Sequence, residues 1–193
     1  MNICHIVCPD IRARLPESPG CYWLVACQNV YGTGEPVVKP VPRMTNPDPF
    51  GVLYIGKAGR SNNGILEGTI RDRAGYELSL NLVKGRTAGH VPTYDYAHSD
   101  MVLRDMYPLD QLAIAWIEMS TAEEADDLEA VSLYRYRNTF GELPPFNRAL
   151  PEKPLFKYGY ESTVGGGSGR FNVGAGSYVP WFVSAADSPF GGW

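Results

Sequence analysis

Long apolar runs are missing from this chain of 193 residues. A membrane-spanning helix needs roughly 18 or more consecutive apolar residues, and no stretch of the sequence approaches that length. The residues from Met1 to His5 also lack the basic start and apolar core of a secretion signal. We therefore expect no membrane association and a cytoplasmic location.

Cysteine is scarce and irregularly spaced. The four cysteines, Cys4, Cys8, Cys21 and Cys27, form no C-x-x-C pair, so we expect reduced thiols and no disulfide framework. Cys4, His5 and Cys8 could hold zinc, but a second pair at ligand spacing is missing. A zinc site is therefore the less favoured interpretation.

Positive charge is also in short supply. The net charge is -4, which excludes a generally basic surface that would coat nucleic acid. The composition, 44% hydrophobic and 20% charged, is that of a globular domain. A chain of this length can bury a core as one domain, and any site for phosphate must be local.

Three apolar stretches predict strands: Gly20–Cys27, Val52–Ile55 and Leu112–Ile117. The first two are joined by one connection, which favours an antiparallel pair. The second delivers Tyr54 and Lys57 to the end of a strand, around the conformationally free Gly56. This arrangement has the form of a site, and it is equally that of a core strand followed by a turn.

Two helices are predicted after these strands. Apolar residues four apart between Ile65 and Val83 form an amphipathic stripe; they are Leu66, Ile70, Ala74, Leu78 and Leu82. Arg73 and Tyr76 should lie on the flank of this helix, with Arg71 and Asp72 toward solvent. The second helix starts at Ser120 or Thr121 with a glutamate three residues on, a capping box, and runs to Arg137.

Glu129 lies at the edge of the apolar face of the second helix. A carboxylate in that position needs a cationic partner to offset its desolvation. The partner could be an arginine or a divalent metal. The residue types alone leave both open.

Two long segments are predicted to be irregular. Residues 28–50 contain five prolines and form a long insertion, either functional or a plain surface loop. The polar stretch from Thr87 to Asp100, with His90, is expected to be a loop, although its aromatic side chains could stack on bases. Residues 151–193, with nine glycines and nine aromatics, are too aromatic for a flexible linker and should pack on the body or on a partner.

The residues from Lys57 to Arg86 are locally basic. Six basic and three acidic side chains give this segment a charge of +3. We therefore assign candidate substrate-binding roles within and just beyond it. The candidates are Arg60, Arg71, Lys84, Arg86 and His90.

Five motifs then occur in one order along the chain. They are Gly20-Cys21-Tyr22, Tyr54-Ile55-Gly56-Lys57-Ala58, Ile70-Arg71-Asp72-Arg73, Ala125-x-x-Leu128-Glu129 and Pro144-Pro145-Phe146-Asn147. In this order they resemble the GIY-YIG nuclease domain of homing endonucleases, of the incision subunit of nucleotide-excision repair and of some type II restriction enzymes. The resemblance covers about residues 19–148.

The resemblance implies an α/β (α+β) fold with a small central antiparallel sheet of three strands flanked by helices. It implies a nuclease domain at 19–150 with the insertion at 28–50. The prolines near the start of the chain predict an N-terminal arm at residues 1–18 with one short helix at most, and the composition of residues 151–193 marks them as a C-terminal extension. The implied activity is hydrolysis of phosphodiester bonds in double-stranded DNA with one divalent metal, Mg²⁺ or Mn²⁺.

The family's functional residues carry over to six positions: Tyr22, Tyr54, Lys57, Arg73, Glu129 and Asn147. Tyr76 is added to them as a candidate substitute for a family histidine. Tyr22 would be the general base, its ordinary pKa of about 10 lowered by Lys57 and the metal. Arg73 would stabilise charge on the phosphate, Glu129 would bind the metal, Tyr54 would position the water or phosphate, and Asn147 would fix the metal-side geometry.

Three departures from the family pattern affect these assignments. Cys21 replaces the usual isoleucine. The family often has a histidine one helical turn after the arginine, where this chain has Glu77, so that Tyr76 is the substitute. The long run before Arg73 leaves Arg71 as an alternative arginine.

The resemblance favours a restriction-type, sequence-specific endonuclease that could act as a homodimer on a palindrome. A repair, phage or toxin-type nuclease with little sequence preference is the alternative within the family. A catalytically silent DNA-binding or protein-interaction module on the same fold, or a chance coincidence of motifs, are the alternatives outside it.

Overall fold

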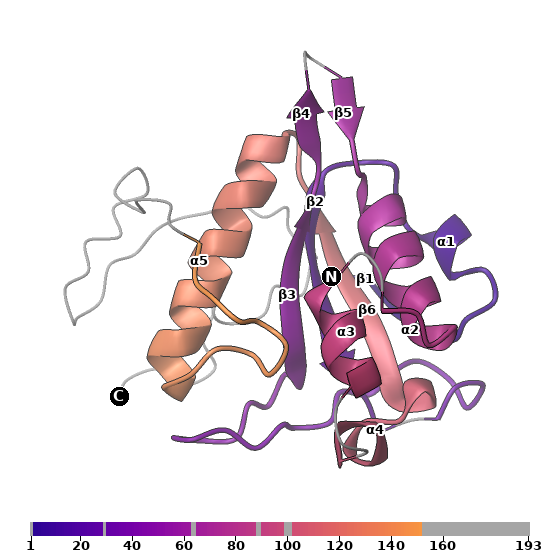
Figure 1. Cartoon of the computed structure of the whole chain (residues 1–193), viewed down its shortest axis with the longest axis vertical. Helices are drawn as coiled ribbons and strands as arrows, with labels where there is room; N and C mark the ends of the chain where they lie inside the picture. Colours follow the sequence, from indigo (N-terminus) through magenta and orange to yellow (C-terminus); the bar gives the residue numbers. More distant parts are fainter. Residues whose placement is uncertain (1, 29, 63–64, 88–89, 99–101, 152–193) are drawn as a thin grey trace.

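A four-stranded antiparallel sheet forms the centre of the molecule, in the order β1-β6-β2-β3. This computed structural model describes residues 2–28, 30–62, 65–87, 90–98 and 102–151. The strands are β1 (Asn2–His5), β2 (Gly20–Ala26), β3 (Val52–Ala58) and β6 (Leu112–Glu118) (Figure 1). The three predicted strands are confirmed, as is the antiparallel pairing of β2 with β3.

The fourth strand, β1, corrects the prediction of a three-stranded sheet, and it is formed by residues of the predicted N-terminal arm. Asn2 pairs with Trp116 and His5 with Ala113, so the start of the chain extends the sheet at the β6 edge. A four-residue strand between turn residues has no recognisable partner in the sequence, because its partner lies more than a hundred residues away. The expected short helix follows as α1 (Ile11–Arg14).

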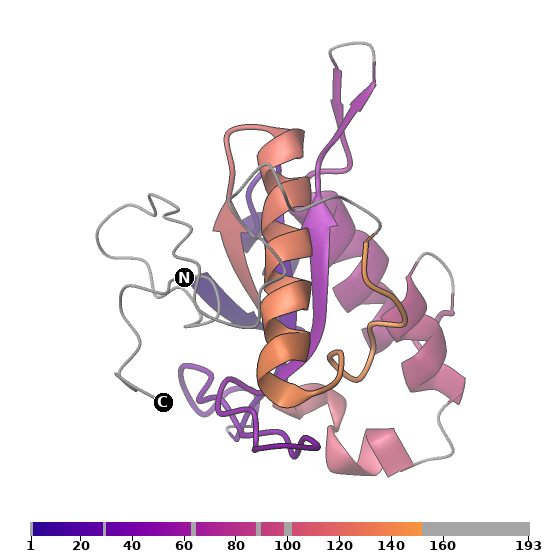
Figure 2. The same cartoon turned by 90° about the vertical axis from the view of Figure 1, so that its left-hand side faces the viewer.

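Helices cover both faces of the sheet. Helix α5 (Ala122–Phe140) lies on one face, and η1 (Arg71–Leu80) and α2 (Asn81–Val83) lie on the other, with α1 beside them (Figures 1 and 2). All seven residues of β2 are buried. Because neighbouring strand residues point to opposite faces, Trp23 packs toward α5 and Tyr22 packs toward η1.

The predicted helix from Ile65 to Val83 is wrong at its beginning. Ile65–Glu67 forms β5, which pairs with β4 (Arg60–Asn62) as a two-stranded ribbon that projects beyond the sheet (Figure 2). Gly68, with φ of +64°, separates the ribbon from the helix. The sequence Asn63-Gly64 is the dipeptide typical of a tight hairpin. The helical spacing of the apolar residues that follow it favoured a helix instead.

The rest of that helix follows the predicted stripe. Ile70, Ala74, Leu78 and Leu82 are buried against the sheet. The residues of η1 form a π-helix, whose wider winding is rare and is often found at functional sites.

Helix α5 confirms the predicted capping box. The side chain of Thr121 accepts a hydrogen bond from the backbone of Glu124, whose own side chain returns to the Thr121 backbone. The helix runs past Arg137 to Phe140 and ends at Gly141, which is left-handed with φ of +76°.

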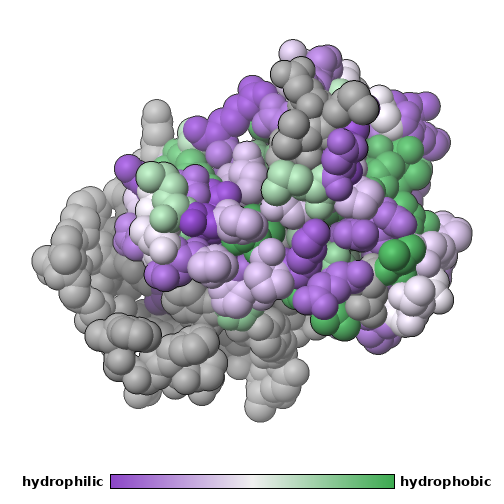
Figure 3. All heavy atoms as spheres, turned by 90° about the horizontal axis from the view of Figure 1, so that it is seen from below, coloured by the Kyte–Doolittle hydropathy of each residue, from purple (hydrophilic) through white to green (hydrophobic). Residues whose placement is uncertain are grey.

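The insertion at 28–50 packs on the core without helices or strands of its own in its described part. Isolated bridges join Cys27 to Val38 and Val41 to Asp48, and Val41 and Asp48 are fully buried. Figure 3 views the molecule from this end, where hydrophilic and hydrophobic residues are interspersed.

The segment 87–100, expected to be a loop, contains helix α3 (Val91–His98). The Thr93 hydroxyl donates to the carbonyl of His90 at 2.6 Å, and the buried Tyr96 hydroxyl donates to the carbonyl of Tyr107 at 2.9 Å. These contacts stabilise a helix that the polar composition of the segment does not predict. Helix α4 (Val102–Met106) and the 3₁₀ turn η2 (Leu109–Gln111) lead into β6.

The described helices include none that is long and apolar enough to cross a membrane. The four cysteines are buried free thiols. The Gly- and aromatic-rich extension, predicted to pack on the body or a partner, lies outside the described residues from position 152 on.

Candidate active site

Regular pairing of β2 with β3 places the two motif tyrosines on the same face of the sheet. Tyr22 pairs with Gly56 and Leu24 pairs with Tyr54, and residues two apart on a strand share a face. Tyr54 therefore lies on the η1 face, where it packs against the core on that side. Just beyond, Val25 pairs with Val52, so Leu53 is an extra residue of β3 in a β-bulge, and its side chain joins the same core.

Tyr22 and Tyr54 lie next to each other around Gly56. Their ring centroids are 6.1 Å apart. A Cβ atom on Gly56 would come within 2.8 Å of the Tyr22 ring and hydroxyl and 2.6 Å of the Tyr54 ring. Glycine at this position is thus required by the space that the two rings occupy.

His90 completes an aromatic cluster with the tyrosines. Its ring centroid lies 6.4 Å from that of Tyr22 and 6.2 Å from that of Tyr54. The ring is buried, and its Nε2 lies 3.2 Å from Oε2 of Glu77, a contact distance without the alignment of a hydrogen bond. Burial, and then the charge of Arg73, lower the His90 pKa to about 4, so the ring is neutral near pH 7.

Arg73 reaches this cluster from the first turn of η1, where its guanidinium pairs with Glu77 one turn later. Its positive charge lowers the pKa of both tyrosines, but burial outweighs that effect. Burial raises the Tyr54 pKa to about 12 and the Tyr22 pKa well above its usual value. This direction is opposite to the lowered Tyr22 pKa that the sequence predicts for the protein with its metal.

The Tyr22 hydroxyl is also buried without a well-aligned hydrogen-bond partner among the described residues. Such a group costs about 1–3 kcal/mol in desolvation. Natural cores keep few of these groups, and each calls for an explanation. A substrate or water oxygen that Tyr22 contacts during function would provide one.

Glu129 lies on α5 near the same end of β3. Its pKa is raised from 4.5 to about 7, chiefly by burial; the charge of Asp126 acts in the same direction, and Lys57 and Arg73 act against it. Lys57 forms an ion pair with Asp126. The Glu129 carboxylate is also close enough to raise the pKa of Tyr22 and Tyr54, so the six groups form one electrostatic unit.

Asn147 acts on the backbone of β3. Its Oδ1 accepts from the Ile55 amide and its Nδ2 donates to the Ile55 carbonyl, both at 2.9 Å. The preceding Phe146 amide donates to the Leu53 carbonyl at 2.9 Å. The Pro-Pro-Phe-Asn segment thus covers the exposed edge of β3 on both sides of Tyr54, and Asn147 holds the strand instead of reaching the carboxylates.

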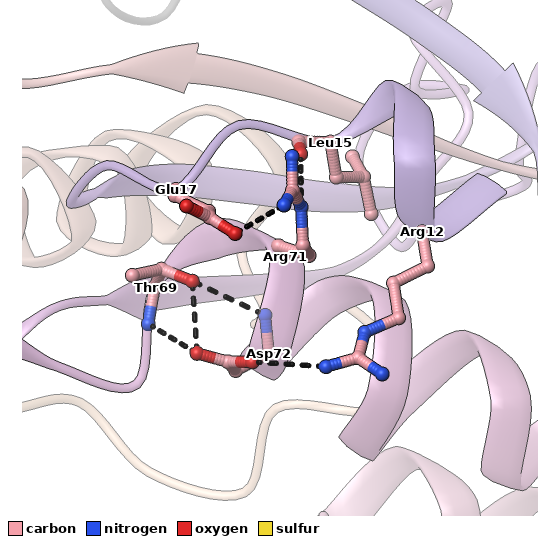
Figure 4. Close-up of polar contacts among 6 residues, drawn as sticks. All are labelled: Arg12, Leu15, Glu17, Thr69, Arg71 and Asp72. Atoms are coloured by element: carbon pink, nitrogen blue, oxygen red, sulfur yellow. Dashed lines mark hydrogen bonds and ion pairs between the residues drawn. The ribbon is translucent and has the colours of Figure 1, made fainter.

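Two predicted residues point away from the cluster. Tyr76 is 46% exposed and its ring lies 5.6 Å from the guanidinium carbon of Arg12. Arg71 donates from Nε to the Leu15 carbonyl at 2.9 Å and pairs with Glu17 (Figure 4). The structure therefore places Arg73, and not Arg71, beside the tyrosines, and places His90 where Tyr76 was expected.

The remaining predicted cations are distributed around the site. Arg60 is exposed at the start of the β4–β5 ribbon, and Lys84 and Arg86 are exposed just beyond α2. The ribbon and α2 lie toward opposite ends of the η1 face (Figure 1). These three cations are thus separated from one another, with the tyrosine cluster on the face between them.

Glu129 and its neighbour Asp126, which pairs with Lys57, are the carboxylates of α5 that lie at this end of β3. Within the described part of the chain, no three His, Cys, Asp or Glu residues gather as a ready-made metal cage. Mg²⁺ is commonly held by one or two carboxylates and keeps several waters. The buried Glu129, with its raised pKa, fits such a cation, because a positive charge would offset the cost of ionising it.

No family model, curated protein or solved structure matches the chain. What the chain does is therefore inferred from its own residues. Sequence reasoning missed Asp126 and Glu77 as parts of the site. Asp126 lies one helical turn before Glu129, and Glu77 one turn after Arg73, so helical spacing was the signal for both.

Proposed function

We propose that this chain is a metal-dependent endodeoxyribonuclease of the GIY-YIG type. The observation that carries the proposal is the convergence of Tyr22, Tyr54, Arg73 and Glu129 from four separate elements onto one end of β3. Two tyrosines, an arginine and a buried carboxylate provide hydroxyl groups, a phosphate-binding cation and a metal ligand. A core built for stability alone has no need of this combination.

Each residue has a role that follows from its chemistry. Arg73 binds two phosphoryl oxygens through its planar donors and stabilises the charge that grows on them. The neighbouring hydroxyls of Tyr54 and Tyr22 orient the attacking water and the scissile phosphate. Glu129 holds the divalent cation, which when bound supplies a polarised phosphoryl oxygen and a more acidic water.

The proton transfer assigned to Tyr22 is the step that its buried surroundings constrain most. Tyr22 as general base must lose a proton although burial favours its neutral form, and Arg73 acts in the favourable direction. His90, neutral near pH 7 and in contact with both tyrosines, is suited to hold the Tyr22 ring in place. Lys57 is engaged by Asp126 and orients the carboxylate side of the site.

Restriction-type, sequence-specific cleavage is the subtype we favour. The net charge of -4 suits limited contact focused on a site better than general binding along DNA. A homodimer would place two such sites on the two strands of a palindrome.

Cleavage of supercoiled plasmid and of phage DNA tests the proposal, with Mg²⁺, Mn²⁺ or EDTA. Wild type is compared with Glu129→Ala and with Glu123→Ala, a matched removal of a carboxylate from the first turn of the same helix. We expect discrete fragments that require metal and Glu129 but not Glu123. A smear would support the less specific nuclease, and DNA binding without cleavage on substrates of varied sequence and methylation would support the silent module.

A further inference from the structure

A pocket separate from the tyrosine cluster lies between α2, α3 and η2. Its volume is about 420 Å³, within the range of small-molecule sites. Leu82, Ala97 and Leu109 provide apolar walls, together with the ring of the buried Tyr96. The cluster and the pocket share α3, because His90 directly precedes this helix and Tyr96 lies within it.

The rim of the pocket carries positive charge without acidic residues. Arg86, Arg104 and His98 are among its lining residues, and none of the described residues that line it is an aspartate or glutamate. In a protein with a net charge of -4, a pocket with two arginines and no acid selects anions.

The cations are available to a ligand. Arg86 forms no ion pair with any described residue, and Arg104 uses Nε to donate to the Tyr96 carbonyl at 2.9 Å. That bond fixes the Arg104 side chain at the rim and leaves its terminal nitrogens as donors. The His98 ring stacks on Tyr94 with centroids 4.1 Å apart, which holds it beside the opening.

We propose that this pocket binds a nucleotide, with its phosphate on Arg86 and Arg104 and its sugar and base against the apolar walls. The anionic character of the ligand follows from the pocket itself, and the choice of a nucleotide over other phosphate esters rests on the proposed function. The nucleotide is either a free mononucleotide or one residue of the bound DNA strand, since both present the same phosphate and base.

Calorimetric titration of the full chain in EDTA tests the proposal, with deoxyadenosine monophosphate, deoxyadenosine and inorganic phosphate as probes. A short DNA duplex is titrated in parallel by fluorescence anisotropy. The variants are Arg86→Gln and Arg104→Gln, and the control is Arg137→Gln, which removes the same charge from the exposed end of α5 on the opposite face.

For a free nucleotide we expect the monophosphate to bind more tightly than deoxyadenosine or phosphate alone. Each pocket variant should then weaken its binding about tenfold, because a charge-assisted hydrogen bond is lost, and Arg137→Gln should not. For a nucleotide within DNA, the monophosphate does not bind and the pocket variants weaken duplex binding more than Arg137→Gln does. If the pocket variants and the control behave alike with both ligands, the proposal is overturned.

The outcome of the binding experiment does not depend on whether the protein cleaves DNA. Glu129→Ala should abolish cleavage without changing nucleotide binding, since Glu129 does not line the pocket. Failure of the nuclease proposal would thus appear as absent cleavage in wild type, and failure of the pocket proposal as unchanged binding in Arg86→Gln and Arg104→Gln.

Discussion

At the scale of single residues, the buried hydroxyls of Tyr22 and Tyr136 differ in their hydrogen bonding. This difference lets an effect on function be distinguished from an effect on stability. The Tyr136 hydroxyl donates to the Asp48 carboxylate at 3.1 Å, whereas the Tyr22 hydroxyl has the Tyr54 hydroxyl beside it without the alignment of a full hydrogen bond. Removing a bonded hydroxyl weakens a fold, and removing an unsatisfied one does not.

Tyr22→Phe and Tyr136→Phe therefore form a matched pair. We expect Tyr22→Phe to keep or slightly raise the free energy of unfolding and to lower the cleavage rate by at least a hundredfold. Tyr136→Phe should reduce the free energy of unfolding by about 1–3 kcal/mol and leave the rate per folded molecule nearly unchanged. Urea unfolding and plasmid cleavage measure the two effects, and a Tyr22→Phe variant with full activity would remove Tyr22 from the mechanism.

Glu129 gives the stability of the protein a specific pH dependence. Its pKa in the folded protein, about 7, lies above its value of 4.5 in the unfolded chain. The folded state therefore binds the Glu129 proton more tightly than the unfolded chain does. The stability that this proton contributes is fully present below pH 4.5 and is lost as the pH rises through 7.

Glu129→Gln should remove this dependence. We expect the variant to be more stable than wild type by about 1–3 kcal/mol at pH 8 and by almost nothing at pH 4. Thermal or urea unfolding across this pH range in EDTA measures the difference. Mg²⁺ should narrow the difference at pH 8 by stabilising wild type alone, and equal stability of the two proteins at every pH would mean that Glu129 ionises freely.

At the scale of elements, β3 is positioned by the segment that covers its edge. The Asn147 side chain bonds both backbone groups of Ile55, in the way that a neighbouring strand would. The resemblance implied that Asn147 fixes the geometry on the metal side of the site, and its contacts in the structure stabilise the strand that carries Tyr54.

Asn147→Ala should therefore reduce both stability and activity. Loss of two backbone-directed hydrogen bonds should lower the free energy of unfolding by about 1–3 kcal/mol, and added Mg²⁺ should still bind. Metal affinity, measured by calorimetry, separates this role from that of a ligand: an affinity as weak as that of Glu129→Ala would assign Asn147 to the metal after all.

The elements that sequence could predict are those with a signal inside their own residues. Strands β2, β3 and β6 are long apolar runs, and α5 carries its capping box and its terminal glycine. Strand β1, the β4–β5 ribbon and α3 depend on contacts with distant residues, such as the pairing of Asn2 with Trp116. Periodicity could not reveal contacts between distant parts of the chain.

The site was predictable to a similar degree. The order of the motifs correctly anticipated that Tyr22, Tyr54, Arg73 and Glu129 lie near one another. The place of His90 was not predictable, because a residue outside any motif reaches the tyrosines through the packing of α3. The burial that raises the Tyr22 pKa was not predictable either, since it depends on the packing of the whole core.

At the scale of the whole molecule, the insertion at 28–50 is tied to the far end of α5. Arg43 is 7% exposed, pairs with Glu142 at 3.1 Å, donates to the Leu143 carbonyl and lies over the Tyr136 ring. This network joins the insertion to the end of the helix that carries Glu129.

Arg43→Ala should consequently destabilise the entire fold. We expect a loss of about 2–4 kcal/mol in urea unfolding, because a nearly buried cation and its partners are separated. Arg14→Ala, which breaks an exposed ion pair with Asp10, should have a much smaller effect, because solvent screens the attraction between exposed charges. A small effect of Arg43→Ala would show that the insertion is a dispensable surface loop.

The regular alternation from Tyr54 to Gly56 makes the number of residues there matter as much as their identity. Inserting one residue between Tyr54 and Gly56 would leave every chemical group of the site in the sequence, yet it would turn the Tyr54 ring to the α5 side of the sheet. The bulge at Leu53 lies on the other side of Tyr54, so a change of length there leaves the pairing of Tyr54 with Leu24 in place. A related chain that keeps both tyrosines should therefore keep the count between Tyr54 and Gly56, and it can vary the connection before β3 more freely.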